Sequence, residues 1–320
     1  MKQRNLGKSG VQVSALGLGC NALGGRIDQE ASRRVVHTAL DLGITLFDTA
    51  DLYGDSYSSP GGSESSLGQI LGDRRKDVIL ATKFGNERMQ YDAGIKGGGS
   101  RRVVMQAVEG SLKRLKTDWI DLYQMHKPDR LTPIEETLRA LDDLVRQGKV
   151  RYIGCSNFSA WQVVDAQWTA KYSSLNAFIT CQNEYSVLMR NIERDLLPAM
   201  RAHGLGLVPY FPLAGGLLTG KYKRNEPPPP DTRFARKSRW TGHFMVDENW
   251  TKLERLERFC AERNRNLLEL AFGWLLSQPI VSSVIAGATR PEQLKSNLRA
   301  TEWTLSADEM AEIDRLTSSP

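Results

Sequence analysis

The sequence predicts an α/β fold, a closed (β/α)8 TIM barrel with an N-terminal β-hairpin and extended loops at the C-terminal face. Short apolar runs without a polar face recur about eight times along the 320 residues, which is typical of parallel strands covered on both sides. Longer stretches with helical spacing of apolar residues separate these runs. Eight consecutive βα units are the number that closes such a barrel.

The extreme N-terminus differs from this repeat. The stretch RNLGKSGVQV predicts a β-hairpin whose turn runs from Gly7 to Gly10, and we expect it to close the bottom of the barrel. No linker or change in composition divides the chain, so we expect residues 1–320 to form a single domain. The barrel strands are expected at residues 15–19, 44–48, 78–83, 120–126, 152–156, 179–184, 206–210 and 283–286.

The helices are predicted from their ends. Asp28 is typical of an N-cap, and Gly43 marks the end of the helix that follows it. Ser100 begins a helix with a continuous apolar stripe. Thr132 and Pro133 indicate a cap with proline at the first helical position. Further helices are expected near Ser63, Ser159, Asn191, Glu248, Asn266, Arg290 and Ser306.

Two regions depart from the repeat and are predicted to be loops at the C-terminal face. Residues 85–100 are rich in glycine, and residues 221–240 contain four consecutive prolines that exclude a regular helix. In the second region basic residues outnumber acidic ones. Both regions follow predicted strands, and long loops in that position usually shape a site.

The composition suits a soluble globular protein, because 40% of the residues are hydrophobic and 25% are charged. No apolar run approaches the roughly 20 residues that cross a bilayer, and the first residues lack the apolar core of a signal peptide. We therefore expect a cytoplasmic location and no membrane partner. The net charge of +6 comes mostly from bases that alternate with acids along helices, which does not indicate a nucleic-acid partner. The scattered cysteines, Cys20, Cys155, Cys181 and Cys260, predict buried thiols.

Ionisable side chains stand at the ends of several predicted strands. Asp48 ends the second strand, Lys83 the third and His126 the fourth, and Tyr53 follows Asp48 in the stretch FDTADLYGDS. The C-terminal strand ends of a barrel converge on one mouth, so we expect these side chains to meet there. Asp48 and Lys83 should form an ion pair, because removing either would leave the other charge uncompensated.

This set of residues predicts proton donation by a tyrosine. A lysine cation beside Tyr53 favours the phenolate and is expected to lower the tyrosine pKa, so that the phenol can donate a proton near neutral pH. His126 would orient a carbonyl oxygen toward that phenol. The set contains neither a nucleophile with its base nor a metal cluster, which favours chemistry whose reactive atom belongs to a cofactor. The motif GLGCNA at residues 17–22 matches a dinucleotide fingerprint, but no helix starts inside it, which argues against a Rossmann unit.

Seven segments carry a resemblance to a known family. They are GITLFDTADLYG (43–54), ATKFG (81–85), DLYQMHKPD (121–129), GKVRYIGCSNF (148–158), CQNEYS (181–186), PLAGGLLTGKY (212–222) and VIAGATRPEQLKSN (284–297). In this order they resemble the aldo-keto reductase family over essentially the whole length. The resemblance implies a barrel that binds NADPH in extended form and reduces aldehydes or ketones to alcohols. It assigns Tyr53 as the proton donor, supported by Asp48, Lys83 and His126.

The resemblance also implies which residues bind the cofactor. Ser156 and Asn157 would hydrogen-bond the nicotinamide carboxamide. Gln182 and Asp48 would lie beneath the nicotinamide in the same site, and Tyr210 would stack on its ring. Arg290 would pair with a 2′-phosphate, since a planar guanidinium suits phosphate oxygens. The remaining residues expected along the cofactor are Gly19, Asn21, Phe211, Leu213, Gly215, Lys221, Gly287, Thr289, Gln293 and Asn297. Phe211 stands where many members have serine, so the phosphate contact through that hydroxyl is not expected here. Some members carry lysine where this chain has Gly287 or its neighbours, so recognition of the 2′-phosphate is expected to differ in detail.

Two alternatives remain open at this point. A regulatory or redox-sensing subunit, similar to the channel β-subunits of this family, would keep the barrel and cofactor but act by binding a partner. A barrel hydrolase would use paired carboxylates such as Asp48 and Glu184. The second alternative leaves Lys83, Tyr53 and Tyr210 without roles. Neither the substrate nor the oligomeric state follows from the sequence.

Overall fold

A computed structural model describes residues 1–54, 61–91, 96–230, 232–235 and 240–318. Within these residues, eight parallel strands form one sheet in the order β10-β3-β4-β5-β6-β7-β8-β9. The strands are β3 (Leu16–Gly19), β4 (Leu46–Asp48), β5 (Ile79–Phe84), β6 (Ile120–Met125), β7 (Val150–Ser156), β8 (Thr180–Gln182), β9 (Gly206–Leu207) and β10 (Val284–Gly287).

The sheet closes on itself. Leu207 of β9 forms a parallel bridge with Val281, in the segment that leads into β10. Its amide donates to Ile280 O and its carbonyl accepts from Ser282 N, each over 2.8 Å. The predicted (β/α)8 barrel is therefore confirmed.

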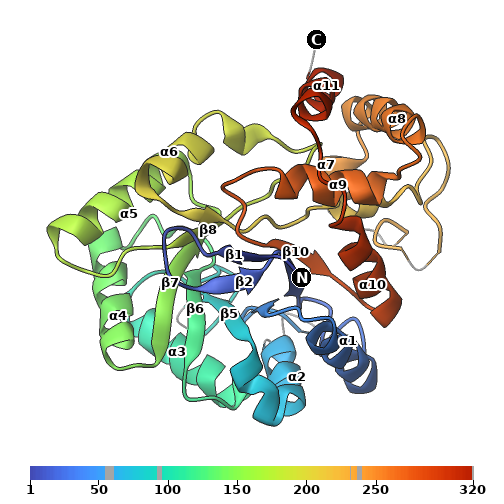
Figure 1. Ribbon diagram of the computed structural model, residues 1–320. Helices are drawn as coiled ribbons and strands as arrows, with labels where there is room; N and C mark the ends of the chain where they lie inside the picture. The colour runs from blue at the N-terminus through green and yellow to red at the C-terminus, as the bar shows by residue number, and fades with distance from the viewer. Residues whose placement is uncertain (55–60, 92–95, 231, 236–239, 319–320) are drawn as a thin grey trace.

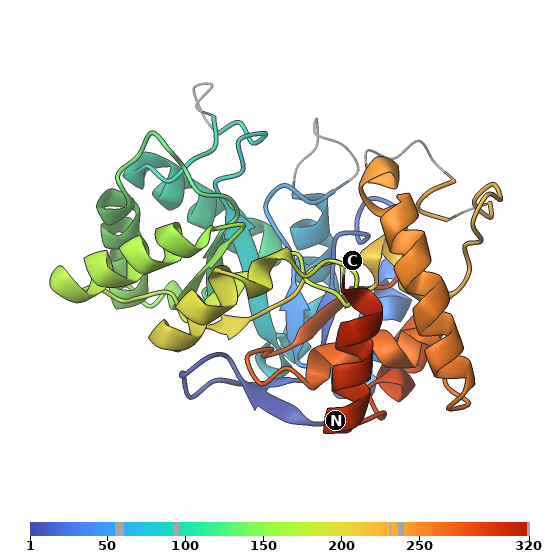
Figure 2. The same ribbon diagram turned by 90° about the horizontal axis from the view of Figure 1, so that it is seen from above.

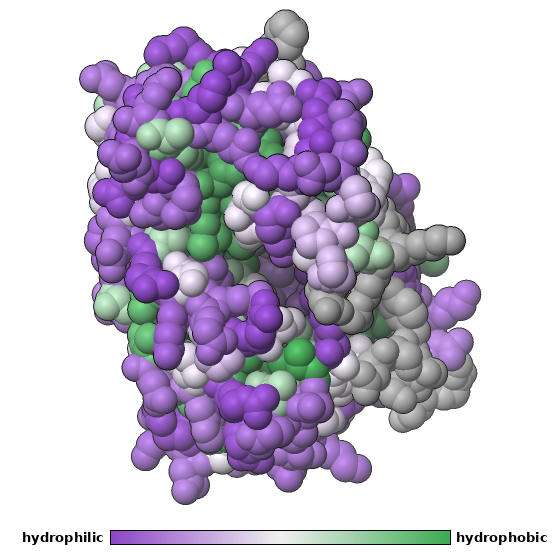
Figure 3. Space-filling view, turned by 90° about the vertical axis from the view of Figure 1, so that its right-hand side faces the viewer, coloured by the Kyte–Doolittle hydropathy of each residue, from purple (hydrophilic) through white to green (hydrophobic). Residues whose placement is uncertain are grey.

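Helices surround the barrel on the outside (Figure 1). They are α1 (Gln29–Asp41), α2 (Gly62–Leu71), α3 (Arg101–Leu115), α4 (Ile134–Arg146), α5 (Ala160–Tyr172), α6 (Leu196–His203), α7 (Thr241–Phe244), α8 (Asp247–Ala261), α9 (Leu267–Leu276), α10 (Pro291–Ala300) and α11 (Ala307–Thr317). Among the described residues, no helix is both long and apolar enough to span a membrane. The face turned toward the viewer in Figure 3 is largely hydrophilic, with apolar surface mainly in its recesses.

The N-terminal hairpin closes the bottom of the barrel, as predicted. Strands β1 (Gln3–Asn5) and β2 (Gln12–Ser14) pair antiparallel, and Figure 2 shows them at one end of the barrel. Leu6 and Val13 are fully buried against interior residues of the barrel strands. Gly7 adopts a φ of +58°, and a Cβ there would lie 2.4 Å from the carbonyl oxygen of Ile179. The hairpin can lie this close to the barrel only with glycine at that position.

Several predicted ends are confirmed and one is displaced. Asp28 caps α1 by accepting from Ala31 N over 2.7 Å. Pro133, however, occupies the N-cap position of α4 itself, and the helix begins one residue later than predicted. The expected cap fails because the hydroxyl of Thr132 donates to Asp129 instead.

Two other predictions were wrong in extent. The helix expected near Asn191 is only a 3-10 turn, Asn191–Glu193, and α6 starts further on at Leu196. The strand expected at residues 206–210 is paired as a strand only over Gly206–Leu207. Beyond Leu207 the amides of Val208 and Tyr210 still donate to Cys181 O and Asn183 O over 3.1 and 3.0 Å, and a single bridge joins Tyr210 to Glu184.

Candidate active site at the barrel mouth

Lys83 and Asp48 form a buried ion pair inside the barrel. Lys83 Nζ lies 2.6 Å from Asp48 Oδ2 and donates a second hydrogen bond of 2.9 Å to Thr49 O. The lysine side chain is wholly buried and that of Asp48 is 5% exposed. The pairing expected from the sequence is confirmed.

The second oxygen of Asp48 is also occupied. Oδ1 accepts from Gln182 Nε2 over 2.9 Å and from Gln124 Nε2 over 3.2 Å. Glu184, the other half of the hydrolase alternative, lies 3.0 Å from His243 Nε2 through both carboxylate oxygens. Because both carboxylates are engaged with other groups, the geometry gives no support to a free catalytic pair of acids.

Tyr53 lies against the ion pair and against His126. Lys83 Nζ is 5.0 Å from the centroid of the Tyr53 ring. The ring of His126 is 5.9 Å away and nearly perpendicular to it, at 84°. The structure therefore brings together the four side chains that the sequence placed at the mouth.

The protonation states follow from burial and from the lysine charge. Burial raises the pKa of Tyr53; Lys83 lowers it by a smaller amount, so the pKa ends above its ordinary value. The lowered tyrosine pKa expected from the sequence was wrong for this reason. Burial also works against the charge of Lys83, but Asp48 and Tyr53 together outweigh it and the lysine pKa is raised. Burial, helped by the charges of Lys83 and Lys127, lowers the pKa of His126 to about 3, so the imidazole is neutral.

A chain of hydrogen bonds runs along one side of the mouth. Asn157 Nδ2 donates 2.9 Å hydrogen bonds to His126 O and Ser156 Oγ, while its Oδ1 accepts from the hydroxyl of Tyr210 over 2.8 Å. Ser156 Oγ donates in turn to Gln182 O over 2.9 Å. The four residues expected around a nicotinamide therefore form one connected network.

The segment after Tyr210 has unusual backbone geometry. Phe211 and Ala214 have left-handed φ angles of +54° and +46°, and Gly215 follows with +68°. The ring of Phe211 packs edge-on against Trp240 at 4.9 Å and Phe244 at 5.3 Å. The guanidinium of Arg233 lies 5.2 Å from the centroid of the same ring. Phe211 therefore packs within the loop and offers no hydroxyl to a ligand.

Basic side chains from distant segments converge beside this loop. Burial lowers the pKa of Lys221, and the charges of Arg233 and Arg290 lower it further. Burial lowers the pKa of Arg233 to about 10, with a contribution from the charge of Arg26. Within the part of the chain that the structure describes, no acid forms an ion pair with Lys221, Arg233 or Arg290. Such a cluster of cations suits a polyanionic ligand.

Sequence reasoning missed Arg26 and Arg233. The excess of basic residues at 221–240 was a signal for Arg233, but it could not say which of them turns inward. Arg26 stands far from that segment in the sequence, and only the closing of the barrel brings the first loop beside it.

The first and last βα units of the barrel meet where β3 pairs with β10. Gly19 pairs in register with Gly287, and Asn21 Oδ1 lies 3.5 Å from where a Cβ of Gly287 would be. Gln293 Oε1 accepts from the amides of Thr289 and Arg290 over 2.8 and 3.3 Å, which fixes the start of α10. Asn297, one turn later on the same helix, is 4% exposed. Thr289, Arg290 and Gln293, which are expected along the cofactor, thus lie at a helix N-terminus, which favours phosphate binding.

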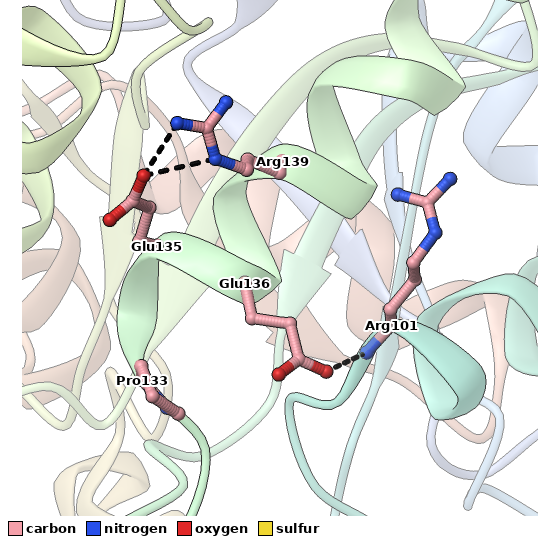
Figure 4. Close-up of a pocket in the computed structure, with 5 residues that line it drawn as sticks. All are labelled: Arg101, Pro133, Glu135, Glu136 and Arg139. Atoms are coloured by element: carbon pink, nitrogen blue, oxygen red, sulfur yellow. Dashed lines mark hydrogen bonds and ion pairs between the residues drawn. The ribbon is translucent and has the colours of Figure 1, made fainter.

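A shallow pocket of about 350 Å³ lies elsewhere, at the starts of α3 and α4. Arg101, Pro133, Glu135, Glu136 and Arg139 line it (Figure 4). Glu135 binds Arg139 over 2.6 Å, and Glu136 accepts from the amide of Arg101 over 2.9 Å. The guanidinium of Arg101 pairs with Asp143 over 2.6 Å. Since these side chains already have partners, we do not assign the pocket a catalytic role.

The cysteines are free and buried, as predicted. Among the residues that the structure describes, no three His, Cys, Asp or Glu side chains gather in a way that could hold a metal ion.

Comparison with known proteins agrees with the fold. The sequence model of the aldo/keto reductase family matches residues 15–318. An oxidoreductase of Bacillus subtilis named YrpG is 37% identical over 100% of this chain and 97% of its own length. A probable voltage-gated potassium channel subunit beta of Oryza sativa is 36% identical over 94% of this chain and 91% of its own. The L-glyceraldehyde 3-phosphate reductase of Escherichia coli K12 is 33% identical over 98% of this chain and 92% of its own length. The chain belongs to the aldo/keto reductase family of oxidoreductases.

Proposed function

We propose that this protein reduces aldehydes or ketones to alcohols with NADPH, and that Tyr53 donates the proton. The observation that carries the proposal is the position of the Tyr53 phenol against the Lys83 ammonium and beside the neutral ring of His126. We further propose a cytoplasmic location and a small carbonyl compound as substrate.

The residues at the mouth fit a nicotinamide dinucleotide phosphate. Ser156, Asn157 and Gln182 present amide and hydroxyl groups at the edge of the mouth, where a carboxamide would find both donors and acceptors. The ring of Tyr210 is anchored through its hydroxyl and offers a flat face for stacking. In this proposal these residues orient the nicotinamide, and the bound cofactor supplies the hydride.

The convergent cations fit the phosphates of the same ligand. Lys221 and Arg233 lie beside the left-handed loop that follows Tyr210, where a pyrophosphate would relieve their mutual repulsion. Arg290 stands at the N-terminus of α10 and would take the 2′-phosphate. A ligand of this charge explains why three cations share one region without acidic partners among the described residues.

Tyr53 would act as a general acid with Lys83 as its support. A phenol with a raised pKa keeps its proton at neutral pH, so it is in the form required of a donor. As negative charge develops on the carbonyl oxygen, Tyr53 releases its proton, and the phenolate that remains is stabilised by Lys83. Asp48 holds the lysine in place, and the neutral His126 can donate a hydrogen bond to the same oxygen without carrying charge.

A panel of aldehydes and ketones, followed at the nicotinamide absorbance with NADPH and NADH in turn, tests the proposal. The panel should include L-glyceraldehyde 3-phosphate, because a relative is named for its reduction. We expect multiple turnovers with NADPH on at least one carbonyl. Tight NADPH binding without turnover on any compound would instead favour a regulatory subunit, the role named for the channel relatives.

A further inference from the structure

Helix α5 carries a stripe of exposed aromatic side chains. Trp161 is 69% exposed, Trp168 42% and Tyr172 81%. At about 100° per residue these three side chains project within roughly 40° of one another around the helix axis. The opposite face, with Val163 and Ala166, is buried against the barrel. Figure 1 shows α5 at the left edge of the molecule, with its outer face away from the other elements.

The stripe is as large as the largest apolar patch on a typical monomeric protein, and such a patch is often functional. Aromatic side chains carry roughly 150–250 Å² each, so the exposed fractions leave on the order of 400 Å² of aromatic surface per copy. The composition of the stripe points to an interaction site, because tryptophan and tyrosine are enriched among the residues that contribute most to binding at interfaces. None of the three residues belongs to the mouth, so the mechanism does not explain them.

We propose that two copies of this chain associate through α5, as an antiparallel pair of helices centred on Trp168. In a two-fold arrangement of this kind, a residue a given number of positions before Trp168 lies level with the residue the same number after it in the other copy. Asp165 and Lys171 are each three positions from Trp168 and carry opposite charges. Both are exposed on the outer face, so the dimer would contain two such pairs across its interface.

The same register matches the apolar residues. Tyr172 of one copy lies level with Val164 of the other, and Trp161 lies level with Leu175, which follows the helix. Val164 and Leu175 are partly exposed. A pairing centred on Asp165 instead would bring two carboxylates together, so the charges also disfavour that alternative register.

Lys171 and Asp165 can each form an ion pair with a second copy of the chain. The ammonium of Lys171 lies 4.6 Å from the ring centroid of Trp168, and no acid is paired with it in the described part of the chain. The carboxylate of Asp165 likewise has no ion pair or hydrogen bond among the described residues. Charge complementarity of this chain with itself is the reason we identify the partner as a second copy.

Sedimentation velocity over a wide range of protein concentration tests the proposal on the intact chain. We expect a weak, reversible monomer–dimer equilibrium, because the stripe of about 400 Å² per copy is smaller than the roughly 600 Å² per partner of stable interfaces. Trp168→Glu would bring two carboxylates together at the two-fold axis and should raise the dissociation constant at least about tenfold. Leu131→Glu, at a 94% exposed residue outside α5, is the matched control and should change nothing.

A charge exchange separates this interface from any other. Asp165→Lys alone places lysines opposite lysines and should weaken the dimer about tenfold, since two pairs per dimer become repulsive. Asp165→Lys combined with Lys171→Asp restores opposite charges and should restore the dimer. A protein that stays monomeric at every concentration overturns the proposal, and so does a double variant as weak as the single one. These readouts do not depend on enzymatic activity, so they remain valid if the proposed reaction is wrong.

Discussion

The ammonium of Lys83 and the carboxylate of Asp48 are 2.6 Å apart in a part of the barrel almost closed to solvent. A buried pair of this kind is costly to break, because the remaining charge has no water to solvate it. Asp48 is additionally held by Gln124 and Gln182, so it cannot turn away if the lysine is removed.

Lys83→Met is therefore expected to lower the free energy of unfolding by about 3–5 kcal/mol. In the double variant Lys83→Met with Asp48→Asn, no uncompensated charge remains, and part of that stability should return. Urea denaturation of the wild type and the two variants measures both effects. A single variant as stable as the wild type would contradict this account of the pair.

Tyr53→Phe should retain NADPH binding and lose turnover by roughly 10²–10⁴-fold, because it removes only the proposed donor. Tyr123→Phe is a matched control. Tyr123 lies in strand β6, and its hydroxyl is buried without a partner among the described residues. Removing that hydroxyl should therefore leave turnover nearly unchanged. Steady-state kinetics with cofactor titration by fluorescence distinguishes the two variants. Full turnover in Tyr53→Phe would remove it as the donor.

The barrel could be predicted from the sequence because strands buried on both faces leave continuous apolar runs, and eight of these permit few arrangements. A detail that escaped prediction depends on a single competing interaction. Thr132 binds Asp129 instead of capping α4. Such an interaction leaves no periodic signal.

The meeting of Asp48, Lys83 and His126 followed from topology alone, since strand ends of a barrel share one mouth. The sign of the Tyr53 pKa shift did not follow, because it depends on how deeply the packed side chains bury the phenol. The order of the strands indicates that Lys83 lies near Tyr53. It does not indicate how far the packed side chains exclude water from the phenol.

The proposed roles of two cations predict different losses of cofactor affinity. Arg290→Ala should weaken NADPH by roughly 10–100-fold and NADH very little, because only NADPH has the 2′-phosphate. Lys221→Met should weaken both cofactors alike, because both contain the pyrophosphate. Dissociation constants for the two cofactors with each variant provide the measurement. Equal losses for both cofactors in Arg290→Ala would reject its assignment to the 2′-phosphate.

The imidazole of His126 should remain neutral across the physiological range, since its pKa is lowered to about 3. The lowered pKa also means that protonation opposes folding, so this residue makes stability fall as the pH drops from about 6.5 toward 3. The ring resonances of His126, assigned by comparison with His126→Asn, should not titrate above about pH 4. A titration midpoint near the ordinary histidine pKa would show that the ring is solvated.

Asp51, two residues before the proposed donor, is a buried carboxyl with an incomplete set of partners. Its Oδ2 accepts from the hydroxyl of Tyr91 over 2.6 Å, while Oδ1 is buried and has no partner among the described residues. Burial and the nearby charge of Glu64 raise the pKa of Asp51 to about 7. Glu64 is itself paired with Arg114 over 2.7 Å, so its negative charge persists beside Asp51.

Because the pKa of Asp51 is raised, its contribution to stability falls as the pH rises, whereas that of His126 falls as the pH drops. Between about pH 4 and 7 the folded state binds the Asp51 proton more tightly than the unfolded state, so stability from this group is present at low pH and lost as the pH rises. Asp51→Asn cannot ionise. Its stability relative to the wild type should therefore be about 2.5 kcal/mol greater at pH 8 than at pH 5, because only the part of the window between about pH 5 and 7 contributes. Tyr91→Phe removes a hydrogen bond that favours the ionised carboxylate of Asp51. This variant should therefore raise the pKa of Asp51 and move the pH-dependent loss of stability to higher pH. Denaturation curves at both pH values give the difference directly, and an equal difference at each pH would mean that Asp51 does not titrate in this window.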